Sequence, residues 1–458
     1  MHSFHEQLKE WYDIHSAKIL QGYMEFLRFP SISTDIHYKE ETRKTALWLF
    51  DYLVNIGLES EIWETKGHPV LFASHLKAGR DRPTLLIYHH YDVQPVEPLE
   101  LWKTDPFEPV IKNNQIFARG ALDNKGQCFY SLNAIAAFLA LAEKNHLNIK
   151  VLIEGEEETG SAGTFGLLVE KAATLQADYL LIVDAGIPAA GVPAITLGSR
   201  GITTLHIELQ NGHVDLHSGE HGGIALNPIR ALVTLLSGLW DEKGRVAIAG
   251  FYDEVEPLSL EELKLYDPHF DQEDYQKSFG VKAFAPEPGY GVIESNWFRP
   301  TLEINGIQGG YSGPGFKTVL PSKAMVNISA RLVPNQDPDI ISKKIEDFLR
   351  SRLPEGLLLN IEIGHGAKAY RCSYPSVIAK ICAEAYEEVF KKECQLMLCG
   401  GSIPIISELA KTSGAEALLM GLGLAQDDIH APNEHFGLDR FEQGFLVMGG
   451  ILNRLSMS

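Results

Sequence analysis

The sequence predicts a layered α/β domain with a mostly parallel sheet, into which a smaller second domain is inserted. Short apolar runs without polar alternation, typical of strands covered on both faces, alternate with helical stretches through the first 198 residues. Near Gly198 the pattern changes to strands with alternating apolar residues. A chain of 458 residues is also too long for one ordinary core, so two domains are expected.

The elements of the first domain follow from the spacing of its apolar residues. These recur at helical intervals over residues 4–28, and Pro30 ends that helix. A second helical stretch runs from Cys128 to His146. The predicted strands cover residues 83–88, 149–153 and 179–183. Because strands and helices alternate, the strands are expected to lie mostly parallel in one sheet.

The smaller domain is expected to cover residues 199–372, so that residues 1–198 and 373–458 form the two parts of the first domain. A last strand at 357–363 and a new amphipathic helix at 374–390 mark its end.

Within the smaller domain, an alternating strand at 202–209 is followed by a helix over 227–241. The stretch from 258 to 300 is aromatic-rich and weakly periodic. We interpret it as an insertion in this domain.

The composition is that of an ordinary globular protein with an excess of acidic residues. Sixty acidic and forty basic residues give a net charge of -20, which repels phosphate backbones and anionic membranes. We therefore expect neither a nucleic-acid nor a membrane partner. Some of the carboxylates could be neutralised by bound cations, which only the motifs can decide.

The cysteines and the N-terminal residues are typical of a protein from a reducing compartment. Five scattered cysteines without a Cys-x-x-Cys pair suggest neither a disulfide framework nor a zinc ribbon. The N-terminal residues mix charges and aromatic side chains where a signal peptide needs a continuous apolar stretch, and no window reaches about 18 consecutive apolar residues. A cytoplasmic protein is the expectation.

His90 and Asp92 follow the predicted strand at 83–88 directly, at the carboxyl end where open α/β sheets build their sites. A lone His-x-Asp is usually without function. A metal-bound histidine, however, often needs a carboxylate to hold its other ring nitrogen. Asp92 is therefore a candidate for orienting His90.

Asp123 lies in a glycine-bounded turn before a helix that is expected to begin near Gln127. Two interpretations are open. Its carboxylate could cap the free amide groups of that helix. Alternatively, its two oxygens could bridge two cations.

Four carboxylates crowd the segment from Glu154 to Glu158, directly after the predicted strand at 149–153. An acidic run is commonly a solvated surface. After a buried strand, however, mutual repulsion is costly unless cations or shared protons relieve it. This position favours metal binding or acid-base chemistry.

Two further residues complete the set. Asp184 ends the predicted strand at 179–183, and His430 lies close to the C-terminus. Each alone would be better explained by a core or turn role. Together the five motifs offer two histidines and at least three carboxylates, a set that suits zinc, manganese or cobalt in a two-metal hydrolytic site.

The order of these motifs resembles the M20 family of metallopeptidases, and most closely its dipeptidase branch. The matching segments, over about residues 85–434, are H-Y-D-V-Q-P, R-G-x-x-D-x-K-G, E-E-x-G-S, the strand-end aspartate and H-x-P-N-E. The second unit matches through D-L-H-S-G, K-T-V-L-P, R-L-V-P-N and G-G-S-I-P. The resemblance implies a three-layer α/β/α zinc-peptidase catalytic domain with an inserted α+β domain, which serves as a lid and as the dimerisation surface of a homodimer.

The resemblance also implies a ligand set for two divalent ions per subunit. One ion would be held by His90, Asp123 and Asp184, and the other by Asp123, Glu158 and His430. Asp123 would be the shared bridge. Zinc is the expected metal, with manganese or cobalt as alternatives.

Catalytic and substrate residues follow from the same resemblance. Glu157 would be the general base, which takes a proton from the attacking water and delivers it to the leaving amine. His217 would reach the partner subunit's active site and stabilise the oxyanion. Arg331 would grip the substrate's carboxylate through its planar guanidinium. The further expected substrate contacts are Thr318, Gly401, Ser402 and His365, the last being equally well explained as an ordinary strand end.

The implied reaction is hydrolysis of dipeptides or short peptides with a free C-terminal carboxylate. Asp184 resembles the dipeptidase and aminopeptidase members, because many carboxypeptidases and acyl-amino-acid hydrolases of the family carry Glu there. One departure counts the other way. Cys399 stands before Gly-Gly-Ser where close dipeptidase relatives often have an acidic residue, which puts recognition of the substrate's amino end in question. An N-acyl-amino-acid deacylase or carboxypeptidase of the same family is the alternative.

Other classes fit less well. A catalytically dead relative would usually lack the base or a ligand, yet Glu157 and all five ligands are present. Neither Ser402 nor Ser312 lies in the G-x-S-x-G elbow of a serine hydrolase. The glycine-rich segment 309–315 lacks the spacing and the Lys-Ser/Thr of a phosphate loop, so a turn is expected there.

Overall fold

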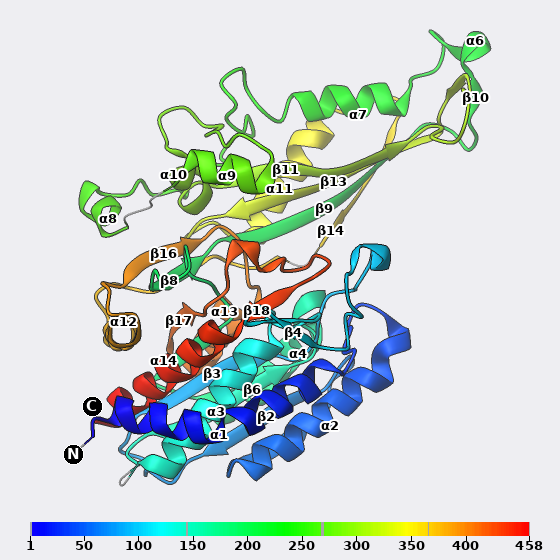
Figure 1. The fold of residues 1–458 in the computed structure, drawn as a ribbon. Coiled ribbons are helices and arrows are strands. Elements are labelled where there is room, and N and C mark those ends of the chain that lie inside the picture. The colour runs from blue at the N-terminus through cyan, green and yellow to red at the C-terminus, as the bar shows by residue number, and fades with distance from the viewer. Residues whose placement is uncertain (1, 143–144, 267–269, 365, 458) are drawn as a thin grey trace. The chain divides into compact units, whose positions relative to one another are not determined.

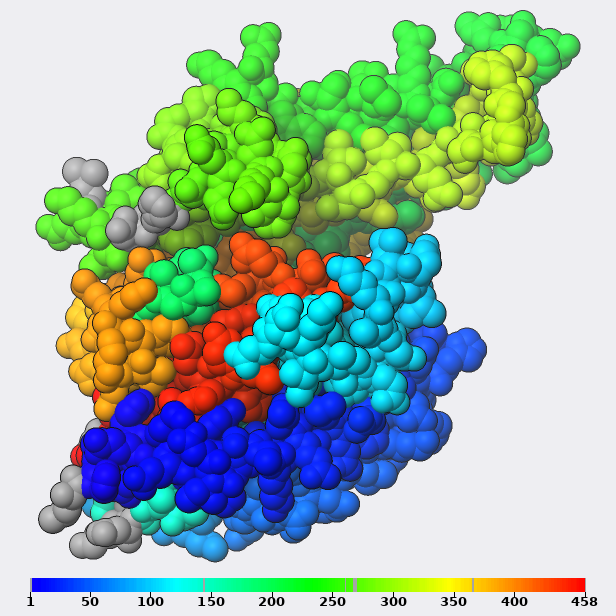
Figure 2. Space-filling model, viewed as in Figure 1, coloured from blue at the N-terminus to red at the C-terminus, as the bar shows by residue number. Residues whose placement is uncertain are grey.

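The computed structural model describes residues 2–142, 145–266, 270–364 and 366–457. The chain forms two compact units, which are described separately (Figures 1 and 2). Unit 1 consists of Met1–Gly198, Cys372–Met397 and Ile405–Ser458, and unit 2 of Ser199–Arg371 and Leu398–Pro404.

The segment Leu398–Pro404 departs from the expected division, which placed all of residues 373–458 in the first domain. The backbone N–H of Arg200 donates to the carbonyls of Cys399 (3.3 Å) and Gly401 (3.0 Å). These bonds hold the segment in unit 2, and a sequence pattern cannot reveal them.

A large mixed sheet organises unit 1. Its strands are, in spatial order, β1 (Glu59–Trp63), β2 (Val70–His75), β6 (Asn148–Glu154), β3 (Thr84–His90), β7 (Tyr179–Val183), β17 (Glu416–Met420), β8 (Ala194–Ser199) and β15 (Tyr370–Arg371), and β16 (Gln395–Cys399) also pairs with β8. The four strands β6, β3, β7 and β17 are parallel. β1, β2 and β8 pair antiparallel, so the predicted parallel arrangement holds for the centre of the sheet only.

Helices cover both faces of this sheet, which gives the predicted three layers (Figure 1). One layer holds α1 (Phe4–Leu27), α2 (Lys39–Asn55), α3 (Lys125–Leu141), α12 (Val377–Phe390) and α14 (Leu438–Met457). The other layer holds α4 (Ala162–Glu170), α5 (Ala172–Leu175) and α13 (Ile405–Ser413).

Two of these helices show how local sequence sets the boundaries. Ser3 and Glu6 form a capping box that starts α1, and the helix ends at Leu27, before Pro30, as predicted. α3 begins at Lys125, earlier than expected, and its side chains are buried nearly all round. A helix that is apolar on every side is typical of a buried one, and α3 packs between the sheet, α1 and α14.

A smaller antiparallel sheet in unit 1 joins the chain near its C-terminus to the segment before α3. Its strands are β18 (His435–Gly437), β5 (Gln115–Phe117) and β4 (Val110–Lys112). His435 pairs with Phe117, so the chain after His430 lies beside the chain that leads into Asp123.

Unit 2 is built on a four-stranded antiparallel sheet. Its strands are β11 (Thr301–Gly309), β13 (Lys323–Leu332), β9 (Gly201–Gln210) and β14 (Leu358–Ile363). Burial alternates along β9 as predicted, and its buried side chains form a core with α7 (Pro228–Ser237) and α11 (Pro338–Ser351). α7 ends at Ser237, four residues before the predicted end of that helix.

Unit 2 has two further parts outside this sheet and its core. A ribbon of β10 (Leu216–His217) and β12 (Val319–Leu320) extends beyond one end of the sheet and, with α6 (Ser218–His221), forms the green and yellow-green tip in Figure 2. The stretch interpreted as an insertion contains the short helices α8 (Leu260–Leu265), α9 (Gln272–Phe279) and α10 (Val292–Trp297). Among the described residues, none of the helices combines the length and apolarity that a membrane crossing needs.

Candidate metal centre

Parallel strands in unit 1 bring the predicted ligands to one edge of the sheet. His90 is the last residue of β3, Asp184 follows β7, and Glu157 and Glu158 lie in the turn after β6. The carboxyl ends of neighbouring parallel strands meet at the same edge, so these side chains converge. Asp123 reaches the same place from the turn that precedes α3.

Five side chains form two overlapping clusters that could each hold a metal ion. The first comprises His90, Asp123 and Asp184, the second Asp123, Glu158 and His430, and within each cluster the ligand atoms lie within 4.8 Å of one another. Asp123 belongs to both. Its Oδ1 lies 3.1 Å from Nε2 of His90, and its Oδ2 lies 2.8 Å from Nε2 of His430.

The structure does not support the capping interpretation of Asp123, the first of the two that the sequence left open. The N-cap residue of α3 is Asn124, which makes no side-chain capping bond. The carboxylate of Asp123 faces the two imidazoles instead. Its two oxygens are therefore divided between the two clusters.

The carboxyl groups of the centre repel one another in a buried setting. Burial and the charge of Asp123 raise the pKa of Glu158 to about 7. Burial also raises the pKa of Asp184 to about 6, against the opposing effect of His90. The carboxyl groups of Asp123 and Glu158 raise the pKa of the His430 imidazole to about 10 through hydrogen bonds.

These residues fit divalent cations. Oε1 of Glu158 is buried and has no hydrogen-bond partner among the described residues, an expensive situation for a carboxylate oxygen unless a cation binds it. Two imidazole nitrogens and several carboxylate oxygens form the donor set that first-row transition ions accept. His430 also adopts a left-handed backbone with φ of 61°, a strained conformation of the kind concentrated at functional sites.

Asp92 holds two parts of the centre together. Nδ1 of His90 lies 3.1 Å from the main-chain oxygen of Asp92 and 3.3 Å from its carboxylate. The same carboxylate accepts the backbone N–H groups of Glu157 (3.2 Å) and Glu158 (3.1 Å) and the hydroxyl of Ser33 (2.6 Å). Asp92 therefore contacts the histidine and also anchors the turn that carries the two glutamates.

Asn124 is a site residue that the sequence analysis missed. Its amide donates to Oδ1 of Asp184 and to the carbonyl of Val183, both at 2.8 Å, and its Oδ1 lies 3.1 Å from Nδ1 of His89. Burial lowers the pKa of His89 to about 3, so this imidazole is neutral. The only sign of Asn124 in the sequence is its position next to Asp123. Its contact with Asp184 forms only when the chain is folded.

Glu157 lies in the turn Glu157–Thr159, close to the clusters. Burial raises the pKa of its carboxyl group well above the usual range, and the charges of Asp184, Glu158 and Asp123 act in the same direction, whereas His90 opposes them. A carboxyl group in this environment holds and releases a proton nearer neutral pH than an exposed glutamate does.

In unit 2 the structure places Arg331, Gly401 and Ser402 in one neighbourhood. Arg331 lies in β13 opposite Ile202 of β9. Arg200, two residues before Ile202, donates from Nε to the carbonyl of Gly400 (2.7 Å), and the hydroxyl of Ser402 donates to the carbonyl of Gly201 (3.0 Å). The charge of Arg331 contributes, after burial, to lowering the pKa of Arg200 to about 10, so the two guanidinium groups are neighbours.

His217 and Thr318 lie at the β10–β12 ribbon, beyond the end of the four-stranded sheet that is opposite Arg331. His217 pairs with Val319, and the N–H of Ser218 donates to the carbonyl of Thr318 (3.0 Å). The ribbon begins beyond Lys323, eight residues along β13 from Arg331, which is about 26 Å in an extended strand. His365, the remaining candidate, lies outside the described residues.

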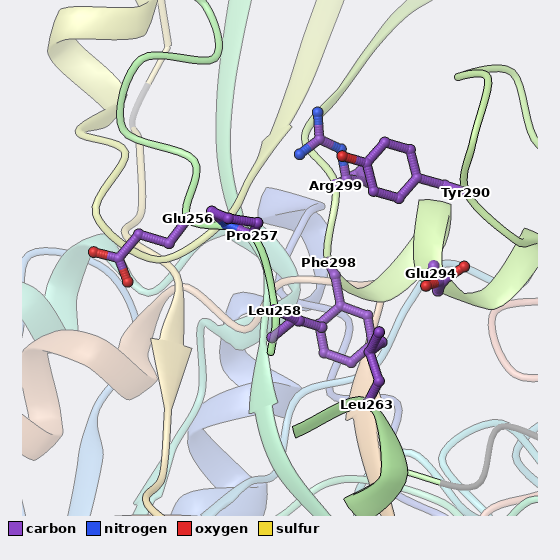
Figure 3. A pocket seen from close by; sticks show the side chains of 8 residues that line it. All are labelled: Glu256, Pro257, Leu258, Leu263, Tyr290, Glu294, Phe298 and Arg299. Carbon is purple, nitrogen blue, oxygen red and sulfur yellow. The ribbon is translucent and has the colours of Figure 1, made fainter. Parts of the chain in front are cut away.

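Two cavities in unit 2 are lined by arginine residues in different environments. One, of about 630 Å³, is lined by Arg200 and Arg331 and by aromatic residues of the insertion such as Phe270 and Tyr275. The other, of about 80 Å³, is shown in Figure 3, where Arg299 lies against the ring of Tyr290. Arg299 is paired with Glu287 through two bonds of 2.7 Å, so its charge is already satisfied.

Comparison with known proteins decides the family. The family model of the peptidase family M20/M25/M40 matches residues 86–454, which include all five candidate ligands. The chain belongs to this family. The resemblance inferred from the motifs is thereby confirmed.

Relatives of this M20 peptidase match over nearly its whole length. Beta-Ala-His dipeptidase from Homo sapiens is 30% identical over 96% of this chain and 88% of its own length. A Cys-Gly metallodipeptidase from Candida albicans is 30% identical over 95% of this chain and 94% of its own. These similarities place the chain with the dipeptidase branch of the family.

A solved structure supports the fold. An M20 family metallo-carboxypeptidase from Sulfolobus solfataricus superposes with a TM-score of 0.88 at 32% identity, over 96% of this chain and 99% of that one. The predicted fold class, an α/β catalytic domain with a separate smaller α+β domain, is confirmed.

Proposed function

We propose that this M20 peptidase hydrolyses dipeptides or short peptides with a free C-terminal carboxylate, at a centre that binds two divalent metal ions. The observation that carries the proposal is the carboxylate of Asp123, whose two oxygens face His90 and His430 in two overlapping ligand clusters. A bridging carboxylate between two such clusters is the arrangement of a two-metal hydrolytic site.

The proposed ligands are the residues of the two clusters: His90 and Asp184 for one ion, Glu158 and His430 for the other, and Asp123 for both. When bound, the two ions would supply Lewis-acid chemistry, lowering the pKa of the attacking water and polarising the scissile carbonyl. Zinc is the proposed metal, with manganese and cobalt as alternatives that the same donors accept.

Glu157 is the proposed general base. Its burial among other carboxyl groups raises its pKa, which suits a group that must take a proton from water and return it to the leaving amine near neutral pH. Asp92 supports this role, since it accepts the backbone N–H of Glu157 and so fixes the turn from which the side chain extends.

Arg331 is the proposed anchor for the substrate's carboxylate, since a guanidinium can form paired charge-assisted bonds with it. Gly401 and Ser402, held near Arg200 and Gly201, are proposed as neighbouring substrate contacts. His365 is a further candidate for contact with the substrate.

We propose that the active molecule is a homodimer in which His217 and Thr318 serve the partner's site. Because they lie in the ribbon beyond the end of the unit 2 sheet that is opposite Arg331, a short peptide gripped by Arg331 cannot also reach them within one chain. β11 offers a surface for pairing: it lies at the edge of the sheet, and most of its residues are exposed, including Ile304 and Ile307. On this proposal unit 2 is both lid and dimerisation domain.

A cytoplasmic location is proposed on the cysteines. None of the five forms a disulfide within the described part of the chain, and four are buried. Buried unpaired thiols are typical of proteins from reducing compartments.

A second candidate function is removal of an acyl group or a C-terminal residue from a longer substrate. Two observations favour it: Cys399 stands before Gly-Gly-Ser, where the family resemblance leads us to expect an acidic residue in a dipeptidase, and a similar solved structure is a metallo-carboxypeptidase. The metal centre and base would be the same, and only recognition of the substrate's amino end would differ.

The deciding experiment is a substrate panel with protein stripped of metal and reconstituted with Zn²⁺, Mn²⁺ or Co²⁺ in turn. The panel contains β-Ala-His, Cys-Gly, dipeptides of common residues, tetrapeptides, and N-acetyl and N-succinyl amino acids. We expect turnover of dipeptides, lost on stripping and restored by metal. Turnover of the N-acetyl or N-succinyl amino acids alone would establish the second candidate, and no hydrolysis with any metal would refute both.

A further inference from the structure

Glu434 is a fully buried carboxylate without an assigned role. Its exposure is 1%, and it lies four residues after His430 in the H-x-P-N-E segment. Its two oxygens accept four hydrogen bonds: Oε2 from Nη1 of Arg119 and from the N–H of Gly120, both 2.8 Å, and Oε1 from the N–H groups of Leu122 (3.0 Å) and Asp123 (3.1 Å).

Three of these donors belong to the turn that delivers Asp123. A carboxylate has about four lone-pair sites, so Glu434 is saturated by its four donors and its position is defined from both sides. One of them is the backbone N–H of Asp123 itself. The turn also depends on Gly120, whose φ of 78° is unfavourable for other residues.

Arg119 extends the connection to the segment that follows His90. Its Nη2 donates to the carbonyl of Pro95 (2.9 Å), while its Nη1 is paired with Glu434. The backbone adds a further link, because the N–H of Ala118 donates to the carbonyl of Glu434 (3.1 Å). One buried ion pair therefore connects the chain segments that carry three of the five proposed ligands: His90, Asp123 and His430.

Stability alone is a weak reason for the buried ion pair of Arg119 and Glu434. Removing two charges from water costs several kcal/mol per ion, and buried ion pairs are often replaceable by apolar residues without loss. What the pair does provide is a defined position for each group it contacts, because charge-assisted bonds are short and directional.

We propose that Glu434, with Arg119, is a positioning residue that holds Asp123 in register with His90 and His430, so that its carboxylate can bridge the two metal ions. The inference rests on the proposed two-metal centre. On this proposal Glu434 increases the affinity of the site for metal and takes no part in proton transfer.

The test measures Zn²⁺ binding by competition with a chromophoric chelator, for wild type, Glu434→Gln and a control. In Glu434→Gln an amide NH₂ replaces one oxygen and faces N–H donors, so two of the four bonds are lost. Loss of a partner that orients a ligand typically lowers metal affinity about 10–100-fold, and we expect a decrease of this size for the more weakly bound ion. The control is Glu287→Gln, which disrupts a buried arginine pair of similar geometry in unit 2 and should leave Zn²⁺ affinity unchanged within about twofold.

The outcomes separate the inference from the proposed function. Wild type that binds fewer than two Zn²⁺ ions would refute both. Wild type and a folded Glu434→Gln that bind two ions with equal affinity would refute the inference alone, as would an equal loss in Glu287→Gln. If Glu434→Gln does not fold, Arg119→Lys decides: its single ammonium cannot reach both Glu434 and the Pro95 carbonyl, so unchanged Zn²⁺ affinity in that variant would overturn the inference.

Discussion

At the scale of single residues, the centre is a set of buried ionisable groups whose environments differ. Glu158 and Asp184 have raised pKa values because they are buried near other carboxyl groups, whereas hydrogen bonds from His90 and His430 keep the pKa of Asp123 below its usual range despite its burial. Divergent pKa values among neighbouring groups are typical of catalytic sites.

Replacement of the proposed base is the sharpest test at this scale. Glu157→Gln has nearly the same shape but cannot accept a proton, so we expect kcat to fall about 10²–10⁴-fold, the usual contribution of general acid-base catalysis. Zn²⁺ binding should remain near the wild-type level, because Glu157 is not a proposed ligand. Near-normal turnover in a variant whose sequence is verified by mass spectrometry would require another base.

The raised pKa of Glu154 should make the stability of the protein depend on pH. Burial raises its pKa from 4.5 to about 7, although the hydroxyls of Tyr88, Ser161 and Thr164 donate to it. The unfolded chain releases this proton at lower pH than the folded chain does. The stabilising contribution is therefore complete below about pH 4.5 and is lost as the pH rises to about 7, a change of about 3 kcal/mol.

Glu154→Gln keeps a neutral polar side chain at every pH, so we expect its stability to fall less than that of wild type between about pH 5 and pH 8. Urea unfolding of the metal-free proteins, followed across this range, measures the difference. Parallel pH profiles for the two proteins would show that Glu154 is ionised in the folded state throughout.

At the scale of elements, the turn before α3 is held by contacts that helix rules do not anticipate. A Cβ added at Gly126 would lie 2.1 Å from the carbonyl of Ala121 and 2.6 Å from the hydroxyl of Tyr23. By propensity alone, alanine would stabilise a helix relative to glycine by about 1 kcal/mol. The packing therefore opposes the local preference.

We expect Gly126→Ala to lower the free energy of unfolding by about 1–3 kcal/mol, the usual cost of overpacking, and to weaken Zn²⁺ binding because the Asp123 turn must move. Gly166→Ala in α4 is the matched control: a Cβ there has nothing within 4 Å, so stability should stay equal or rise by up to about 1 kcal/mol. Thermal unfolding and Zn²⁺ titration of both variants measure the effects. Equal behaviour of the two would mean that the turn adapts freely.

At the scale of the whole molecule, the proposed dimer makes each active site depend on two chains. Arg331 lies towards one end of the unit 2 sheet and His217 in the ribbon beyond the other end, so a site that uses both needs a second copy. If each chain supplies His217 to its partner's site, two inactive variants should complement each other in a mixed dimer.

We expect Glu157→Gln and His217→Ala homodimers each to be nearly inactive, and co-expressed mixed dimers to recover part of the wild-type turnover. In the mixed dimer, one site combines an intact Glu157 with an intact His217 from the other chain. Activity of dimers purified with two different affinity tags measures this recovery. Mixed dimers as inactive as the parents would show that His217 serves its own chain.

The sequence by itself determined the family, the α/β architecture and the identity of the candidate ligands. These follow from features that are local along the chain: apolar periodicity, a polar residue directly after a buried strand, and motifs such as those around His90, Asp123 and His430. Even the change of pattern after Gly198 is visible as a switch from continuous to alternating strands.

The tertiary structure alone decided how these residues are held. Asn124 contacts Asp184, Glu434 accepts the N–H of Asp123, and Leu398–Pro404 joins unit 2, all through bonds between segments 60 or more residues apart. The antiparallel strands at both sides of the unit 1 sheet likewise depend on pairing between distant segments. A local pattern records which residues a strand or turn presents. Hydrogen bonds between distant segments depend on how the chain folds back on itself, and here they position the residues of the proposed metal centre.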